Sequence, residues 1–258
     1  MDGHTGLLLF GAGLAGGIVT AIVGGSSLIT FPALLAAGLP PIVANASNAV
    51  ALTPGTFMAG LADLERRPRW DRSFLGLMGV CVAGSVAGAT LLLLTPEKTF
   101  TAVVPLLIGF ATILFAVSGR IRLWIGSRAA PARATEPSRE SLKLLLFAPV
   151  AVYGGYFGAG MSVMLLALLS ISRADDFRTA NVLKNLLAGL TSLVALLLFV
   201  PQGIVAWGPT LTMMAGTLIG GFVGGRLVRV FSPGVVRAIV ITAGAILTLV
   251  YAWRYWLR

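Results

Sequence analysis

The sequence predicts an all-α, polytopic membrane protein made of two inverted repeats of about five helical segments each, with short broken helices near the midplane. Three observations support this prediction. Of the 258 residues, 57% are hydrophobic and 11% are charged, whereas a soluble domain is roughly 25% charged. Apolar runs recur along the whole chain. Two of these runs are short, follow glycine-rich stretches and lie about 134 residues apart.

The apolar runs give ten segments, five on each side of a basic stretch. They lie at about 6–23, 25–37, 44–62, 73–94, 99–118, 142–157, 160–171, 177–200, 204–226 and 234–256. The basic stretch between them reads GRIRLWIGSRAAPARATEPSRESLK and occupies 119–143. We therefore expect one transmembrane domain over 1–258, with repeat one at 6–118, a cytoplasmic basic linker at 119–141 and repeat two at 142–257.

Two pairs of matching features predict the internal repeat. The segments at 25–37 and 160–171 are too short for a straight crossing, which takes roughly 20 residues. They are the second and seventh segments, so they hold equivalent places in the two halves. The fourth and ninth segments both carry glycines four residues apart, a spacing that lets helices approach closely in lipid. Such spacing is common in a chain with 32 glycines, so the prediction depends on the two pairs together.

The charges of the loops predict the orientation. Cytoplasmic loops of membrane proteins carry an excess of Lys and Arg. Here the basic connections are 63–72, 119–143, 173–178 and 226–237, and the connections nearly free of Lys and Arg are 38–43, 95–98 and 201–206. We therefore expect the linker in the cytoplasm and both termini outside, in a cytoplasmic (inner) membrane. The second half then enters from the opposite face, so the repeats are inverted.

Composition argues against several other classes. One histidine (His4) and one cysteine (Cys81) cannot build a transition-metal site, and the phosphate-binding loop of ATP-driven motors is absent. A serine protease built on GGSS is disfavoured, because His4 precedes the first segment. We expect no cofactor, no metal and no catalytic residue. The net charge of +10 lies mostly in loops, which indicates membrane topology and anionic lipid headgroups rather than nucleic acid.

The two broken helices predict a binding site. Irregular backbone at membrane depth is tolerated only where protein or a water-filled cavity satisfies its polar groups. Paired broken helices in inverted repeats are typical of secondary transporters. A helix start offers unpaired N–H groups and partial positive charge, and glycine lets a ligand approach the backbone. The predicted anion cradle consists of Gly24, Gly25, Ser26, Ser27, Gly158, Gly160 and Ser162.

The segments that follow each short helix add polar side chains to this site. Asn45 and Asn48 share one helix face, and Asn181, Lys184 and Asn185 share another. A charge inside the membrane marks a functional site by default, so Lys184 is expected to balance a bound anion. The alternatives are a lysine whose amine reaches the cytoplasmic surface, and serines and asparagines that only join helices. No acidic residue lies in the middle of a segment, which favours negative cargo.

Several stretches resemble the sulfite exporter TauE/SafE family. They are AGGIVTAIVGGSSLITFPALLAAGLPP followed by ANASN in the first half, and YGGYFGAGMSVMLLALL and TANVLKNLLAGL in the second. The resemblance implies two inverted repeats and transport of small anions, including sulfite, sulfoacetate and aromatic sulfonates. It maps the family's glycine-rich turns onto Gly24, Gly25, Gly158 and Gly160. This chain has Ser26 and Ala159 where members often carry further glycines, and Val182-Leu183 where some carry Thr or Ser.

Together these observations predict a secondary transporter that moves a small anion, a sulfonate or an oxidised sulfur compound, by alternating access. The expected partners are the small anionic substrate and the lipid bilayer, without nucleic acid. Two other functions stay open at this stage. An anion channel would use the same site, and a membrane scaffold or sensor would need neither Lys184 nor the paired glycines. The direction of transport, the coupling ion and the oligomeric state do not follow from the sequence.

Overall fold

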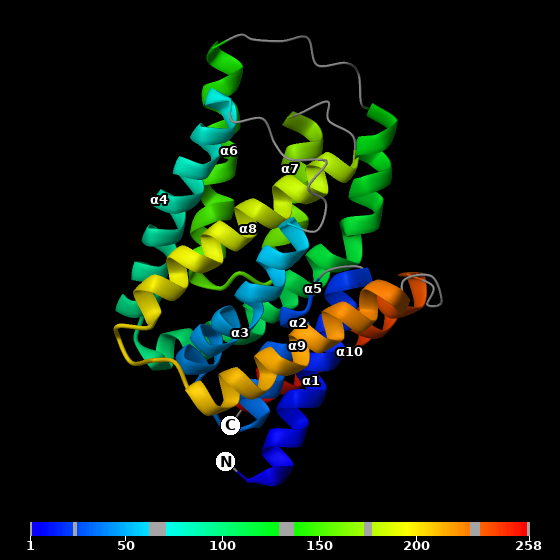
Figure 1. The fold of residues 1–258 in the computed structure, drawn as a ribbon. Helices are drawn as coiled ribbons and strands as arrows, with labels where there is room; N and C mark the ends of the chain where they lie inside the picture. The colour runs from blue at the N-terminus through cyan, green and yellow to red at the C-terminus, as the bar shows by residue number, and fades with distance from the viewer. Residues whose placement is uncertain are drawn as a thin grey trace.

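The computed structural model describes residues 2–22, 25–61, 71–128, 137–172, 177–227 and 233–256. These residues form ten α-helices and no strand (Figure 1). The helices are α1 (Gly3–Ile22), α2 (Ser27–Ala36), α3 (Pro41–Leu61), α4 (Arg72–Leu94), α5 (Glu97–Arg128), α6 (Pro137–Tyr156), α7 (Met161–Ser172), α8 (Phe177–Phe199), α9 (Trp207–Leu227) and α10 (Pro233–Trp256). Each of the ten expected segments coincides with one helix, so the all-α prediction is confirmed.

The outer surface of the helices is apolar, as a lipid-facing surface must be. Among the described residues, α1, α4, α5, α8 and α10 are long and apolar enough to cross a membrane. Large apolar side chains stand exposed on many helices, for example Leu94 at 76%, Leu145 at 69% and Leu249 at 70%. Contiguous apolar surface of this kind is typical of contact with lipid. The prediction of a polytopic membrane protein is therefore confirmed.

Helix α5 continues beyond the point where the sequence suggests a linker. It is 32 residues long and ends at Arg128, and α6 begins at Pro137. Much of the expected linker at 119–141 is thus helical. The charged residues of GRIRLWIGSR end the apolar run, but Arg, Leu and Ile have adequate helix propensity, so they do not end the helix. Hydropathy marks where the segment becomes polar rather than where its backbone stops being helical.

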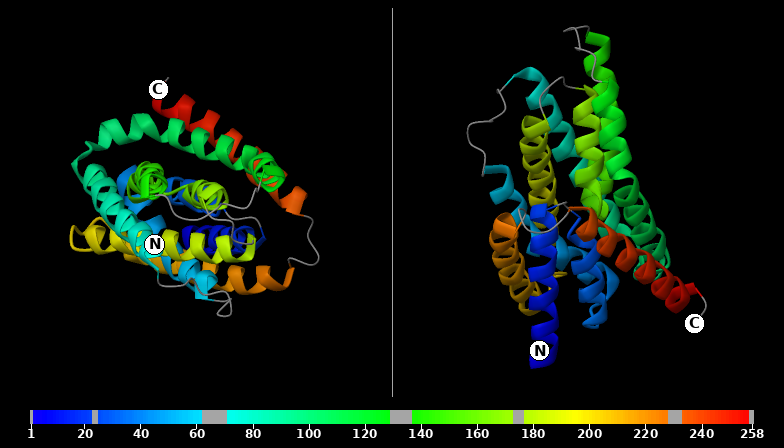
Figure 2. Two further views of the ribbon diagram at one scale, coloured as in Figure 1. Left: turned by 90° about the horizontal axis from the view of Figure 1, so that it is seen from above. Right: turned by 90° about the vertical axis from the view of Figure 1, so that its right-hand side faces the viewer.

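The two short helices fold back on the helices that precede them. A Cβ atom built on Gly16 in α1 would lie 2.7 Å from Cγ2 of Thr30 in α2, so α2 returns along α1. The α6–α7 pair likewise turns back on itself (Figure 2). Figure 1 shows the first hairpin entering from the end that holds both termini, and the second from the opposite end. Both helix breaks therefore lie in the interior of the molecule.

The first helix of each hairpin packs along a helix from the other half of the chain. In α6–α4, a Cβ on Gly84 would lie 2.5 Å from Cβ of Ala151, and one on Gly88 would overlap the carbonyl oxygen of Val152. In α1–α9, a Cβ on Gly220 would overlap the carbonyl oxygen of Leu14. The close approach expected from glycines spaced four apart is thus present in both pairs.

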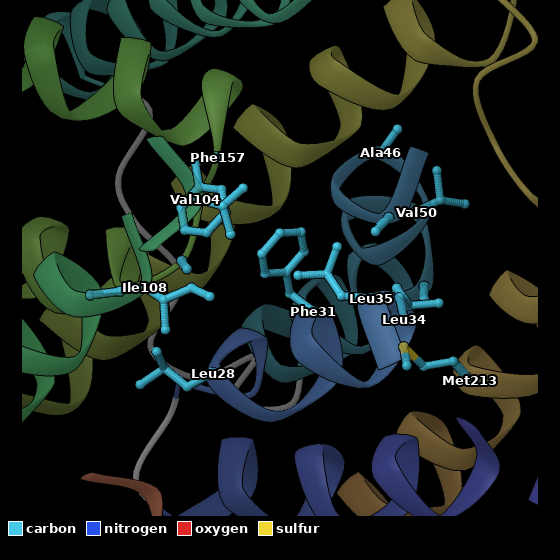
Figure 3. Close-up of a cluster of buried hydrophobic side chains, with 14 of the residues drawn as sticks. Leu28, Phe31, Leu34, Leu35, Ala46, Val50, Val104, Ile108, Phe157 and Met213 are labelled. Atoms are coloured by element: carbon cyan, nitrogen blue, oxygen red, sulfur yellow. The ribbon is translucent and has the colours of Figure 1, made fainter. Parts of the chain in front are cut away.

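Each short helix is surrounded by protein. Six of the ten residues of α2 are buried. Four of them, Leu28, Phe31, Leu34 and Leu35, pack with residues of α3 and α5 in one apolar cluster (Figure 3). Helix α7 occupies a second cluster with α4, α6 and α8. Phe31 of α2 meets Phe157 of the second break edge to face, with ring centroids 5.1 Å apart. Packing of one face of each short helix against neighbouring helices explains how helices too short to span a bilayer are stable within it.

Candidate anion-binding site

A cavity of about 830 Å³ lies between the two hairpins and the helices that flank them. Its walls come from α1, α2, α3, α5, α6, α7, α8, α9 and both breaks. Eleven of the twelve residues expected in the site line it, namely Gly25, Ser26, Ser27, Asn45, Asn48, Gly158, Gly160, Ser162, Asn181, Lys184 and Asn185. The twelfth, Gly24, lies outside the described residues. The structure therefore gathers the predicted set around one space.

The cavity is elongated. Its wall along α8 extends from Asn181 to Phe199, which at 1.5 Å per residue is roughly 27 Å. The lining residues on α8 follow one face, at spacings of three and four. They are Asn181, Lys184, Asn185, Ala188, Ser192, Ala195 and Phe199. A small anion fills only part of such a space.

The first break needs glycine for its shape. Gly25 has φ +90°, a conformation that residues with a Cβ rarely adopt. A Cβ there would also lie 2.8 Å from the ring of Phe115 on α5. Helix α2 then starts with the carbonyl of Ser26 accepting from the N–H groups of Ile29 and Thr30 at 2.9 and 3.0 Å. The Ser26 hydroxyl makes no capping bond, so it is not used to start the helix.

The second break has two glycines in the same conformation. Gly158 has φ +78° and Gly160 has φ +82°. Between them, the carbonyl of Ala159 accepts a hydrogen bond of 2.7 Å from the hydroxyl of Tyr153 on α6. A buried carbonyl without a partner is costly, and the tyrosine satisfies this one from the helix that precedes it. The break is thus a defined structure at the start of α7.

Asparagines of α3 connect the two hairpins. The amide nitrogen of Asn45 donates to the carbonyl oxygen of Tyr156, the last residue of α6, at 2.9 Å. The carbonyl of the Asn48 side chain accepts from the hydroxyl of Thr30 on α2 at 2.6 Å. Both asparagines are 3% exposed. Helix α3 therefore holds the end of one broken helix with Asn45 and the other broken helix with Asn48.

The cation of the cavity is Lys184. Its amine donates to the side-chain carbonyl of Asn181, one turn earlier on α8, at 2.8 Å. The side chain is partly buried and lines the cavity, so its bond to Asn181 keeps it at this wall. No aspartate or glutamate occurs among the described residues of the lining. The electrostatic balance of the described walls is positive, which favours an anion.

Ser47 lies between Asn45 and Asn48 in the sequence, but the structure gives it a contact outside the cavity wall. Its hydroxyl accepts from the N–H of Ala206, just before α9, at 3.0 Å, which is the helix-joining alternative. The sequence analysis also missed the hydroxyls of Thr20, Ser118, Ser192 and Thr217 in the lining. For Ser192 a signal existed, because it lies seven residues after Asn185 on the same face of α8.

Substitution Gly158→Ala is expected to destabilise the protein by roughly 1–2 kcal/mol, because an alanine must adopt positive φ, and to weaken anion binding. Gly203→Ala is the matched control. Gly203 also has positive φ, at +69°, a Cβ placed on it would meet no atom within 4 Å, and it is not part of the cavity wall. Thermal unfolding should show similar losses for both variants. Equal loss of anion affinity in both would contradict a role for the second break in binding.

Comparisons with known proteins agree with this architecture. The model of the family "Sulfite exporter TauE/SafE" matches residues 9–251. The chain is 27% identical to a probable membrane transporter protein of Haemophilus influenzae, over 93% of this chain and 92% of that protein. It is 26% identical to the probable membrane transporter protein YfcA of Escherichia coli K12, over 94% and 87%. No solved structure matches the chain significantly. The chain therefore belongs to the sulfite exporter TauE/SafE family, a family of membrane transporters.

Proposed function

We propose that this protein is a secondary transporter for a small anion, a sulfonate or an oxidised sulfur compound such as sulfite, sulfoacetate or an aromatic sulfonate. The observation that carries the proposal is the cavity at the two helix breaks, whose described walls contain Lys184 and no carboxylate. Family membership and the names of the relatives support transport. The name of the family supports an oxidised sulfur compound as cargo.

Each group of the cavity wall has a part in this proposal. The serine hydroxyls and the backbone N–H groups at the starts of α2 and α7 donate to the oxygens of the anion. Lys184 supplies the balancing charge, held in place by Asn181. Glycines at both breaks keep the backbone open to the ligand. All of these groups bind and orient the anion, and none performs chemistry on it.

Alternating access would use the two hairpins. We propose that the halves are inverted repeats, since α1 packs along α9 while α6 packs along α4. Helices α1 and α6 hold equivalent places in the two halves, and so do α4 and α9. Each first helix therefore packs along the equivalent helix of the other half, as expected of two repeats related by a two-fold axis. A rocking movement of the hairpins against α3 and α8 would expose the cavity to each side in turn. The loop charges favour both termini outside, in a cytoplasmic membrane.

Ligand-dependent thermal stability of the purified protein tests the cargo. The panel contains sulfite, sulfate, sulfoacetate, toluenesulfonate, acetate and two cations. A ligand at 100 times its dissociation constant stabilises the folded state by roughly 2.7 kcal/mol, so binding raises the melting temperature measurably. We expect at least one sulfonate or sulfite to stabilise the protein and neither cation to do so. Stabilisation by cations alone would reject the anion site.

Flux into proteoliposomes tests the mechanism. A carrier with alternating access saturates, and unlabelled substrate inside the vesicles accelerates uptake of labelled substrate. We expect both behaviours for the anion that stabilises the protein. Flux that neither saturates nor shows this counterflow would identify an anion channel instead. Repeating the measurement across an imposed pH gradient reports whether a proton moves with the anion, because proton-coupled uptake responds to the gradient.

A further inference from the structure

Two side chains in the cavity present atoms of opposite hydrogen-bonding character. Asn45 and Asn48 are three residues apart on α3, so their Cβ atoms are about 5–6 Å apart on one helix face. Both are 3% exposed, and both line the cavity. Each uses one end of its amide in a bond to the protein. The other polar atom of each amide, Oδ1 or Nδ2, determines whether that asparagine can accept a hydrogen bond from a ligand or donate one to it.

The side-chain oxygen of Asn45 is not used in a hydrogen bond within the described residues. Its partner, the carbonyl of Tyr156, can only accept, so the amide nitrogen must face it and the oxygen Oδ1 must point away. Within the described residues Oδ1 has no hydrogen-bond partner, and no fully buried side-chain nitrogen or oxygen there lacks one. Oδ1 therefore keeps some accessible surface, and Asn45 is a residue of the cavity wall. It is an acceptor with a fixed orientation.

Asn48 has the opposite arrangement. Its oxygen accepts from the hydroxyl of Thr30 at 2.6 Å, a shorter contact than the 3.1 Å from the same hydroxyl to the carbonyl oxygen of Ser26. The single hydroxyl hydrogen is therefore assigned to Asn48, which turns the NH₂ group the other way. That group also lacks a partner in the described part of the chain. Thr30 is fully buried and is not part of the cavity wall. It is a positioning residue, because it decides which end of Asn48 a ligand meets.

We infer that Asn45 Oδ1 and Asn48 Nδ2 form an uncharged subsite that binds a hydroxyl group carried by the transported anion. A hydroxyl donates to the first atom and accepts from the second, so it satisfies both. A sulfonate or carboxylate group only accepts, and it would leave Asn45 Oδ1 facing another oxygen. The inference rests on the proposed function and deepens it, because among the anions that the site accepts it predicts tighter binding of those that carry a hydroxyl group.

Two sulfonates that differ by one hydroxyl group test this subsite. Binding of 2-hydroxyethanesulfonate and ethanesulfonate to the full-length purified protein is measured by calorimetry. Two hydrogen bonds of ordinary net strength predict roughly 5- to 100-fold tighter binding of the hydroxylated compound. Equal affinities would overturn the subsite and leave the anion site standing, with the asparagine pair holding water. If neither sulfonate binds to the folded protein, the subsite inference is overturned, and the thermal-stability panel of anions then decides separately whether the proposed function stands.

Variants of the asparagine pair test the subsite through the ratio of the affinities for 2-hydroxyethanesulfonate and ethanesulfonate. Because both affinities are measured on the same protein, a partial loss of folded protein does not change this ratio. Asn45→Ala should bring the ratio close to one. Thr30→Val should lower it too, since Asn48 is then free to turn, whereas Thr30→Ser keeps the hydroxyl and should keep the ratio. Lys184→Gln should weaken both compounds alike and preserve the ratio. A ratio that is unchanged in Asn45→Ala and Thr30→Val, in protein with a normal melting transition, would overturn the inference.

Discussion

Replacing Lys184 by glutamine is expected to weaken anion binding roughly 10- to 100-fold and to abolish measurable transport. Hydrogen bonds to charged groups contribute about 1.5–3 kcal/mol, and no second cation lies among the described residues of the cavity wall to replace it. Glutamine keeps a donor of similar length, so the change isolates the charge. Calorimetric titration with the anion that stabilises the parent protein gives the affinity, and proteoliposome uptake gives the rate.

Lys98→Gln is the matched control for this experiment. Lys98 is exposed in the first turn of α5 and lies outside the cavity wall, so its loss should leave both measurements within twofold of the parent. Lys184→Arg keeps the charge but changes its shape, and it should retain part of the affinity. Full activity of Lys184→Gln would contradict a role for this charge in binding. It would support the alternative interpretation, in which the amine of Lys184 reaches the cytoplasmic surface.

Gly88→Leu is expected to have the largest effect on stability. Even a Cβ at this position would overlap the carbonyl oxygen of Val152 and lie 2.7 Å from the backbone nitrogen of Tyr156. Backbone atoms cannot turn aside as a side chain can, so α4 and α6 must separate. Overpacking of this kind typically costs 1–3 kcal/mol or more, and here it also displaces the helix that leads into the second break. Thermal unfolding in detergent measures the loss.

Gly79→Leu serves as the comparison on the same helix. A Cβ on Gly79 meets nothing within 4 Å, so leucine there should be neutral or slightly stabilising, because it is a better helix former than glycine. Gly220→Leu should reproduce the Gly88 effect at the α1–α9 contact, since its Cβ would overlap the carbonyl oxygen of Leu14. Similar melting temperatures for Gly79→Leu and Gly88→Leu would contradict the close packing of α4 on α6.

The sequence predicted the order and extent of the helices well, because lipid imposes a simple rule. A membrane segment must be apolar over a set length, and glycine-rich breaks stand out within it. Hydropathy could not predict the direction in which the helix after each break runs. A break of four residues can continue a helix or reverse it, and the contact between Gly16 and Thr30 shows reversal. The basic residues after Ser118 were likewise visible, but not the helical backbone that carries them to Arg128.

The polar residues of the cavity could be predicted as a group, since polar and ionisable side chains such as asparagine and lysine are rare in lipid-facing positions. Their individual contacts could not. Ser47 and Asn48 are neighbours of similar polarity, yet one bonds Ala206 and the other meets Thr30. Which neighbour a side chain meets depends on residues up to 159 positions away. Spacing along a helix assigns a face, and only the packing of helices assigns the partner.

The pairing of α1 with α9 has a consequence for how the protein is made. Helix α1 is synthesised first, but the backbone that its glycines contact lies about 200 residues later in the chain. At 5–20 residues per second, translation takes roughly 10–40 s to reach it. During that interval the glycine-rich face of α1 has no α9 to pack against. The order of synthesis therefore delays assembly of α1 with α9, and we expect α1 to acquire this partner only after most of the other helices have been made.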